Sequence, residues 1–286
     1  MSAQISSLQI FCRRLLIVTW LAVSLLTPAW GTELPPLQMG VLPYLSTGRL
    51  FEKFLPLKDY LEAQLQRRIV LSTAPNFNTY VQRAAQGEYD IYFTAPHFAL
   101  LAETDQGYRR LGRFTRELDG VIVVRSDSAV QRPEDLRRRT VITPPRLAII
   151  SMLGERLLQN HGLLPDKDYA LQHTSSHDNA IFSVYRGTVD AALIGRALFE
   201  QSSPEVTREL RILASTRTLP HLMAMAHPRL TLAEYRHLKR ALLAFTRNGP
   251  GQKFFEASGL GDMGTITDAD MNRLRPFLSM TRERLQ

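Results

Sequence analysis

Two polar clusters in this 286-residue sequence have the composition of an anion-binding site. In the first, Ser175-Ser176-His177-Asp178, two hydroxyls and an imidazole precede an apolar helical segment. A helix N-terminus gathers free backbone N–H groups and favours negative charge, so a histidine there can donate to a bound anion. The second cluster, Thr94-Ala95-Pro96-His97-Phe98, follows an apolar strand-like run. Ligand crevices form at such strand ends in parallel sheets, so both clusters predict a small-anion site.

Two catalytic or metal-based alternatives receive less support from the sequence. His173 and His177 are four residues apart, but no third metal ligand is evident. Ser176, His177 and Asp190 can be written as a catalytic triad, but no Gly-x-Ser-x-Gly elbow accompanies them. We therefore expect no catalytic residue, no metal and no cofactor, and a binding protein instead of an enzyme.

Other candidates lie at the ends of predicted strands. Tyr44 and Ser46 follow the first strand, and Arg146 lies between a strand and a helix start. Asp190 opens a later strand, where it can hold His177, hold a ligand ammonium group or bind backbone amides. The expected ligand-binding residues are Tyr44, Ser46, Thr94, Ala95, His97, Arg146, Ser176, His177 and Asp190.

The elements that must position these residues alternate between strands and helices. Apolar residues at three- and four-residue spacing predict helices, for example at Leu57, Leu61 and Leu65. Such alternation predicts an α/β fold with mostly parallel sheets flanked by helices. The expected strands are Gln38–Leu42, Arg68–Thr73, Asp90–Thr94, Gly120–Arg125, Thr140–Thr143, Tyr169–Thr174, Asp190–Gly195, Arg211–Ser215 and Met223–Ala226.

An internal similarity relates two segments that lie 100 residues apart without a gap. Asn78–Ile91 aligns with Asp178–Ala191, and in each copy a helical pattern ends at Gly. After two intervening residues, an Asp opens an apolar strand. Two similar α/β units are what a two-lobed clamp needs, with helix N-termini facing a shared cleft.

The C-terminal third is predicted to be helical and to pack on the first lobe. Thr231 begins one helix, Gly249-Pro250-Gly251 interrupts the pattern, and a last helix is expected over Thr267–Leu285.

The N-terminal segment has the layout of a secretory signal. Arg13 and Arg14 precede the apolar run Leu15–Leu26, and Ala29-Trp30-Gly31 offers small residues for cleavage. We expect residues 1–31 to be a cleaved signal peptide, with an uncleaved anchor as the alternative, and the mature protein to be periplasmic. The only cysteine, Cys12, precedes the apolar run, so neither a lipid anchor nor a disulfide is expected.

The charge balance favours anionic ligands. Loss of Arg13 and Arg14 takes the formal charge from +8 to +6, and a basic protein concentrates anions around itself. Arg137-Arg138-Arg139 is interpreted as a solvated face. No basic stripe with interleaved aromatic residues is present, so nucleic acid is not an expected partner.

Several segments, in this order, resemble the phosphate/phosphite/phosphonate-binding family of ABC-transporter periplasmic receptors. The segments are Gly40–Pro43, Pro56–Leu61, Gly87–Ile91 with Ala95-Pro96, Val121–Ser128, Ser175–Asp178 and Gly187–Ala191. The resemblance implies a two-lobed type II periplasmic-binding fold. By this resemblance His177, Asp190 and Tyr44 match the family's ligand-binding histidine, aspartate and aromatic residue.

The same resemblance implies a domain division and partners. Lobe 1 is expected over residues 32–121 and 221–286, and lobe 2 over 122–220. The crossing strands are expected near Gly120–Val124 and Thr216–Met223. A monomer is expected to trap a phosphate-, phosphite- or phosphonate-like oxyanion for an ABC permease, or as the alternative, for a membrane sensor.

Two positions depart from the family's pattern. Pro144-Pro145-Arg146-Leu147-Ala148 stands where the family has a Ser-Thr-Ser-Gly loop, and Ala99 stands where it has a tyrosine. Two prolines remove two amide donors, so a different small molecule is an alternative ligand. Arg146 can replace the lost hydroxyls with a charge-assisted contact.

Overall fold

The computed structural model describes residues 34–247 and 249–286, and Pro36–Gln286 form one compact unit. The predicted signal peptide, residues 1–31, lies outside the described residues. Among the described residues, no helix combines the length and the apolar character that a membrane span requires.

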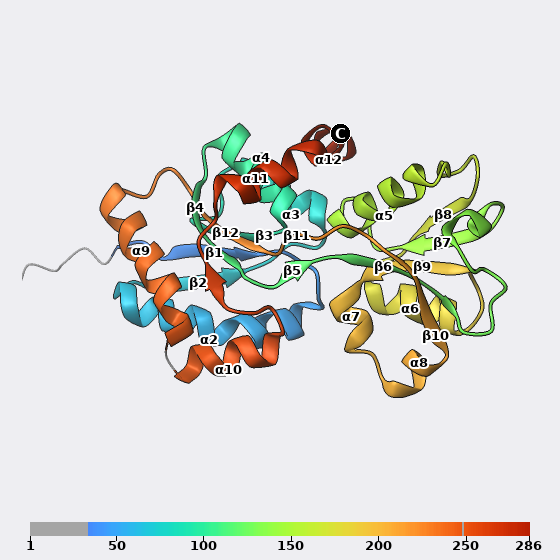
Figure 1. Cartoon of the computed structure of the whole chain (residues 1–286). Helices are drawn as coiled ribbons and strands as arrows, with labels where there is room; N and C mark the ends of the chain where they lie inside the picture. Colours follow the sequence, from blue (N-terminus) through green and yellow to red (C-terminus); the bar gives the residue numbers. More distant parts are fainter. Residues whose placement is uncertain (1–33, 248) are drawn as a thin grey trace, which may run out of the picture. The chain divides into compact units, whose positions relative to one another are not determined.

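A six-stranded mixed sheet forms the centre of lobe 1 (Figure 1). Its order is β13-β4-β12-β3-β1-β2, in which β2, β1 and β3 are parallel and the others join antiparallel. The strands are β1 (Leu37–Val41), β2 (Ile69–Ser72), β3 (Ile91–Thr94), β4 (Arg109–Phe114), β12 (Met223–Ala226) and β13 (Met263–Gly264).

A five-stranded sheet forms the centre of lobe 2 in the same manner. Its order is β10-β6-β9-β7-β8, with a parallel centre of β9, β7 and β8. The strands are β6 (Gly120–Arg125), β7 (Thr140–Thr143), β8 (Ala170–His173), β9 (Ala191–Gly195) and β10 (Leu210–Ser215). The α/β fold with two such sheets is confirmed.

Two short strands join the lobes. β5 (Glu117–Leu118) pairs antiparallel with β11 (Leu219–Pro220). The second crossing therefore lies within the expected range. The first was placed too late, because Gly120–Val124 already belongs to β6 of the second sheet. The lobe boundaries at 121/122 and 220/221 stay a prediction, and "lobe" here denotes the elements built on each sheet.

Helices cover the sheets. Those of lobe 1 are α2 (Thr47–Leu65), α3 (Phe77–Ala85), α4 (Pro96–Gln106), α9 (Leu232–Ala244), α10 (Gly249–Ser258), α11 (Asp268–Leu274) and α12 (Leu278–Leu285). Those of lobe 2 are α5 (Ile149–Asn160), α6 (His177–Tyr185), α7 (Arg196–Glu200) and α8 (Pro204–Arg208). Short 3-10 turns lie at Pro133–Leu136, Phe245–Arg247 and Arg275–Phe277.

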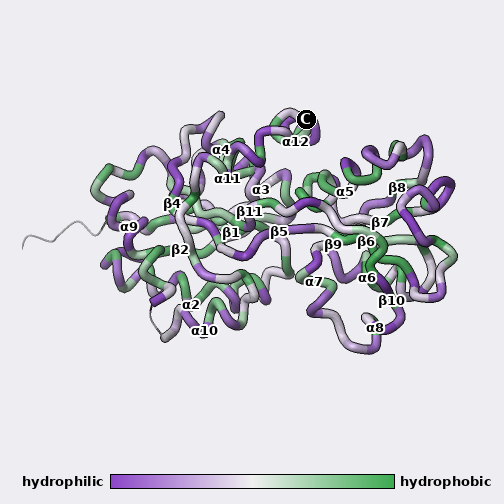
Figure 2. Tube along the Cα trace, viewed as in Figure 1, coloured by the Kyte–Doolittle hydropathy of each residue, from purple (hydrophilic) through white to green (hydrophobic). Residues whose placement is uncertain are grey.

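The central strands are apolar because they are covered on both faces. Every residue of β3, β9 and β12 is buried, and β-branched residues fill β6. Figure 2 shows hydrophobic residues along these central strands and hydrophilic ones on the outer loops. Burial of such side chains contributes about 1.5–3 kcal/mol each to folding.

The internal repeat is confirmed in the helices α3 and α6, which occupy equivalent positions 100 residues apart. Asn76 and Ser176 cap them by accepting from the backbone N–H three residues on. Gly87 and Gly187 follow with φ of 75° and 69°, a left-handed conformation that favours glycine.

The two aspartates of the repeat connect neighbouring parallel strands at the amino ends of β3 and β9, opposite the carboxyl ends. Asp90 Oδ2 accepts from Gln38 N at 2.8 Å, and Asp190 Oδ2 accepts from Thr140 N at 2.8 Å. Each has a guanidinium partner: Arg229 Nε lies 2.6 Å from Asp90 Oδ1, and Arg139 Nη1 lies 3.1 Å from Asp190 Oδ1. Of the three roles expected for Asp190, the structure shows the binding of a backbone amide and not a contact with His177.

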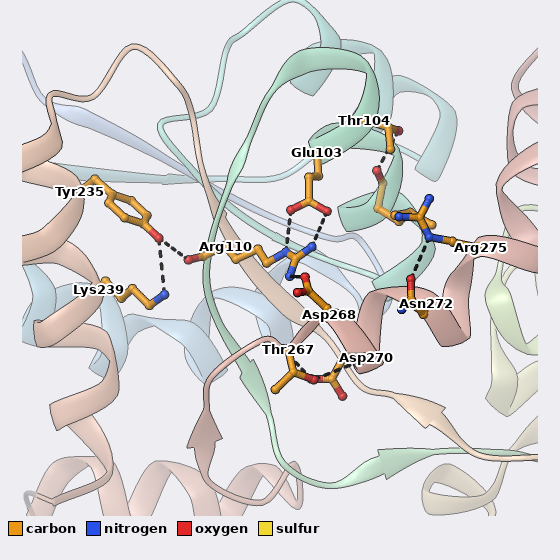
Figure 3. A network of polar contacts seen from close by, with 11 residues as sticks. Glu103, Thr104, Arg110, Tyr235, Lys239, Thr267, Asp268, Asp270, Asn272 and Arg275 are labelled. Atoms are coloured by element: carbon orange, nitrogen blue, oxygen red, sulfur yellow. Dashed lines mark hydrogen bonds and ion pairs between the residues drawn. The ribbon is translucent and has the colours of Figure 1, made fainter.

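The C-terminal elements pack on lobe 1, as predicted. Arg110 of β4 contacts Glu103 of α4 and Asp268 of α11, with shortest distances of 2.6 Å to each (Figure 3). Tyr235 of α9 donates to the carbonyl oxygen of Arg110 at 2.7 Å. The single helix expected over 267–285 is wrong, because a 3-10 turn that contains Pro276 separates α11 from α12.

The aspartate pair generates a stability prediction. We expect Asp90→Ala to lower the free energy of unfolding by about 1–3 kcal/mol, because the backbone N–H of Gln38 loses its buried acceptor. Asp190→Ala should cost less, since its side chain is 31% exposed against 8% for Asp90. Urea unfolding measures both. Equal losses, or a larger loss for Asp190→Ala, would contradict the assignment.

Candidate functional site

A cavity of about 150 Å³ lies between the lobes, where parallel strands of both sheets end. Leu42 and Tyr44 follow β1, Ala95 follows β3, and Gly195 ends β9. β12 runs antiparallel to β3, so the residues just before it, including His221, reach the same edge. The position agrees with the rule that α/β sheets bind ligands at carboxyl strand ends.

Three of the nine predicted ligand-binding residues line this cavity: Tyr44, Ala95 and His177. The other six lie outside its lining. Ser46 and Ser176 are the N-cap residues of α2 and α6. Thr94 is fully buried, and Arg146 is exposed.

The remaining two predicted residues have structural contacts elsewhere. His97 is fully buried, and its Nε2 lies 3.0 Å from the carbonyl oxygen of Leu147. Asp190 lies at the start of β9, the opposite end of that strand from Gly195. Ser176, His177 and Asp190 are therefore not assembled as a catalytic triad.

His177 presents a neutral N–H donor at the start of α6. Its Nδ1 accepts from the backbone N–H of Gly195 at 3.2 Å, which leaves the ring hydrogen on Nε2. Burial lowers the pKa of His177 to about 4, because the charged imidazolium would lose its hydration. The imidazole is therefore neutral at physiological pH.

His221, which the sequence analysis missed, has the same arrangement beside the crossing strand. Its Nδ1 accepts from the backbone N–H of Leu222 at 2.8 Å. Burial, with smaller contributions from the cations Arg116 and Lys53, lowers the pKa of His221 to about 3. Two neutral Nε2–H donors, one from each side, thus line one cavity. The only feature of the sequence that could have indicated His221 as a site residue is its position just before an apolar strand.

Helix α2 supplies the positive charge of the cavity through Arg49 and Lys53. Lys53 Nζ donates to the carbonyl oxygen of Ser258 at 3.3 Å and lies 5.8 Å from the centre of the Tyr44 ring. Burial and then the nearby Arg49 cation lower the pKa of Lys53. Among the described residues, neither cation has a carboxylate within ion-pair distance. An anion beside them would relieve this repulsion.

The other charged residues of the lining already have partners of opposite sign. Arg116 lies 3.1 Å from Glu200, Glu117 lies 2.6 Å from Arg273, and Asp119 lies 2.6 Å from Arg196. The uncompensated charge of the cavity is therefore positive.

Tyr44 adds a further donor. Its hydroxyl is buried and has no hydrogen-bond partner among the described residues. Burial raises the pKa of the Tyr44 phenol well above its usual value, and Arg49 opposes this only in part. The hydroxyl stays protonated and can donate to a ligand.

The structure also bears on the metal site that His173 and His177 could have formed. Among residues 34–247 and 249–286, no group of three or more His, Cys, Asp or Glu side chains lies close enough to hold a metal ion. His173 Nδ1 contacts the carbonyl oxygen of Pro144 at 3.2 Å instead.

The Pro144–Ala148 loop joins the lobes. The carbonyl oxygen of Leu147 is held by His97, and that of Arg146 accepts from Arg284 Nη1 at 2.6 Å. Arg284 also pairs with Glu155 of α5 at 2.5 Å, and their side chains are only 7% and 14% exposed. Arg284 thereby connects helix α12 of lobe 1 with helix α5 of lobe 2.

The sequence profile of a family described as the phosphonate periplasmic substrate-binding protein of ABC transporters matches residues 39–271.

Solved structures share the fold at low identity. A binding protein component of an ABC phosphonate transporter from Pseudomonas aeruginosa has a TM-score of 0.74 at 15% identity, over 88% of this chain and 89% of that one. PhnD1 from Prochlorococcus marinus in complex with methylphosphonate has a TM-score of 0.76 at 15% identity, over 86% and 98%. The aliphatic sulphonate-binding protein SsuA from Escherichia coli has a TM-score of 0.58 at 16% identity, over 87% and 93%.

The lowered histidine pKa values predict a pH dependence of stability. As pH falls through 6.5 the unfolded chain takes up protons on these histidines and the folded chain does not, so the free energy of unfolding should fall. The loss should continue until about pH 4 to 3, where His177 and then His97 and His221 protonate in the folded state. Each histidine contributes up to about 1.4 kcal/mol per pH unit.

Urea unfolding between pH 6.5 and 4.5 measures this slope. His177→Asn keeps an acceptor for Gly195 N–H and should flatten the slope, whereas the exposed His237→Asn should leave it unchanged. A slope that His177→Asn does not alter would contradict a neutral buried imidazole.

The contact between the lobes generates a second prediction. Arg284→Met should lower the free energy of unfolding by about 3–5 kcal/mol, because Glu155 is left buried without its cation. The double variant Arg284→Met/Glu155→Met removes both charges and should recover most of the loss. Chemical denaturation of the three proteins tests this, and equal losses in single and double variants would exclude a buried pair.

Proposed function

We propose that this chain, which belongs to the family of periplasmic phosphonate-binding proteins of ABC transporters, captures a small oxyanion between its lobes and delivers it to an ABC permease. The family consists of periplasmic solute-binding proteins and is not a class of enzymes. Export by a cleaved signal peptide and a monomeric state are parts of the same proposal.

The observation that carries the proposal is the uncompensated positive charge beside neutral donors. Lys53 and Arg49 supply the charge, and His177, His221 and the hydroxyl of Tyr44 supply hydrogen bonds. Hydrogen bonds to a charged group contribute about 1.5–3 kcal/mol each. A few such bonds can provide the roughly 8 kcal/mol that a micromolar dissociation constant requires.

Closure of the lobes supports capture in this cavity. Among the strands that the structure describes, β5 and β11 are the pair at the junction, and their few residues can absorb the rotation that a hinge requires. Lys53 comes from lobe 1 and His177 from lobe 2, so a ligand that contacts both favours the closed arrangement.

A ligand screen tests the proposal. Thermal unfolding would be followed with phosphate, phosphite, methylphosphonate, 2-aminoethylphosphonate and sulfate, and small-angle scattering would follow the radius of gyration. At least one anion should raise the melting temperature and reduce the radius. If no anion shifts either quantity, and native mass spectrometry of protein purified from the periplasm shows no bound anion, the proposal fails.

Removal of the lysine charge gives the sharpest single substitution. Lys53→Met should weaken binding of the best anion by about tenfold to 150-fold, which corresponds to the loss of one charge-assisted bond. Lys58→Met on the same helix is the control, because Lys58 pairs with Asp59 and Glu62 outside the cavity. Isothermal titration measures both, and equal affinities of the two variants would argue against the site.

A further inference from the structure

The hydroxyl groups next to the Pro144–Ala148 loop are turned away from the cavity. Thr143 Oγ1 lies 2.8 Å from Ser151 Oγ, and Ser151 Oγ also donates to the carbonyl oxygen of Pro144 at 3.1 Å. Both side chains are fully buried, and neither lines the cavity. This segment instead contributes Ala148, Ile149 and Ile150 to the lining.

Apolar side chains continue this wall on both lobes. Leu45 follows β1, Leu118 lies in β5, Leu198 lies in α7, and Leu260 follows α10. The unpaired cations, by contrast, both lie on α2. The lining therefore combines two unpaired cations on one helix with apolar side chains from both lobes.

A second hollow of about 700 Å³ continues from this cavity. The two share Leu45, Arg49, Lys53, Gln201 and Ser258. The outer hollow is bordered by Glu52 and Pro56 of α2 and by Gly249, Pro250, Lys253, Phe254 and Ala257 of α10. Helices α2 and α10 pack against each other. The hollow beside them gives room for a ligand that extends past the anion-binding groups.

We propose that the ligand is an organic anion with one compact charged group and an apolar body of several carbon atoms. The inference rests on the proposed function and narrows its ligand class. An inorganic oxyanion would satisfy Lys53 and the histidine donors but would leave the leucine and isoleucine wall without a partner. An apolar body removes that wall and itself from water, which is favourable in proportion to the area buried.

A homologous series of n-alkylphosphonates tests the inference. With the headgroup constant, affinity measured by isothermal titration should rise about threefold to fourfold for each methylene from methyl- to butylphosphonate. Inorganic phosphate should bind more weakly than any of them. Butanol, which has the chain without the charge, should not bind measurably.

A matched pair of variants locates the apolar contact. Leu198→Thr replaces a half-buried leucine of the lining and should reduce the gain between methyl- and butylphosphonate by at least threefold. Leu213→Thr replaces a half-buried leucine of β10 outside the lining and should leave the gain unchanged. Circular dichroism would confirm that both variants fold.

The outcomes separate the two proposals. If methylphosphonate or phosphate binds as tightly as butylphosphonate, the ligand class proposed here is overturned and the anion receptor stands. If Leu198→Thr and Leu213→Thr have the same chain-length dependence, the apolar contact is assigned to the wrong wall and the inference fails. If none of the anions binds, the proposed function itself fails.

Discussion

Two backbone N–H groups determine which hydrogen bonds the cavity can make. The N–H of Gly195 and that of Leu222 each donate to the Nδ1 of a histidine, so His177 and His221 both keep their hydrogen on Nε2. Burial then disfavours a second proton on either ring. The cavity thus gains two directional donors without gaining charge. Its unpaired positive charge comes from Arg49 and Lys53 of α2, and much of the remaining lining is apolar.

The Pro144–Ala148 loop shows how a departure from a family pattern can change the role of a segment. The resemblance implies a Ser-Thr-Ser-Gly loop at this position, whose hydroxyls are expected to hold the ligand. Here the prolines leave carbonyl groups as the main polar groups, and carbonyls repel anions. His97 and Arg284 of lobe 1 use the carbonyl groups of Leu147 and Arg146 as acceptors. The loop therefore contacts the opposite lobe through its backbone carbonyl groups.

The sequence predicted nine of the observed strands, including the partly exposed β8 and β10, and missed β4 and the two-residue strands β5, β11 and β13. Gly120–Arg125, Thr140–Thr143 and Met223–Ala226 were predicted with their observed bounds. β4 was missed because its sequence carries three arginines, which suggest a loop. Their partners include Asp268 and Asp270, which come from a distant part of the chain and leave no local pattern.

The candidate site was predicted in part for a similar reason. Tyr44, Ala95 and His177 follow strands or begin helices, and strand ends can be recognised in a sequence. In the sequence, Lys53 cannot be distinguished from a solvated lysine on a helix. Only the fold shows that it lines the cavity between the lobes. The repeat places Asp90 and Asp190 at equivalent positions, which favours one shared structural role over a ligand contact made by Asp190 alone.

The aspartate of each lobe also sets an order of assembly. In lobe 2, the partners of Asp190 are Arg139 and Thr140, and all three residues lie within one continuous stretch of chain. In lobe 1, Asp90 contacts both Gln38 and Arg229. Nearly two hundred residues of the chain separate Gln38 from Arg229. A chain that emerges N-terminus first can therefore complete its inserted lobe while the lobe that carries its first strand is still open. Strand β1, which contains Gln38, is therefore among the last elements to acquire its full set of neighbours.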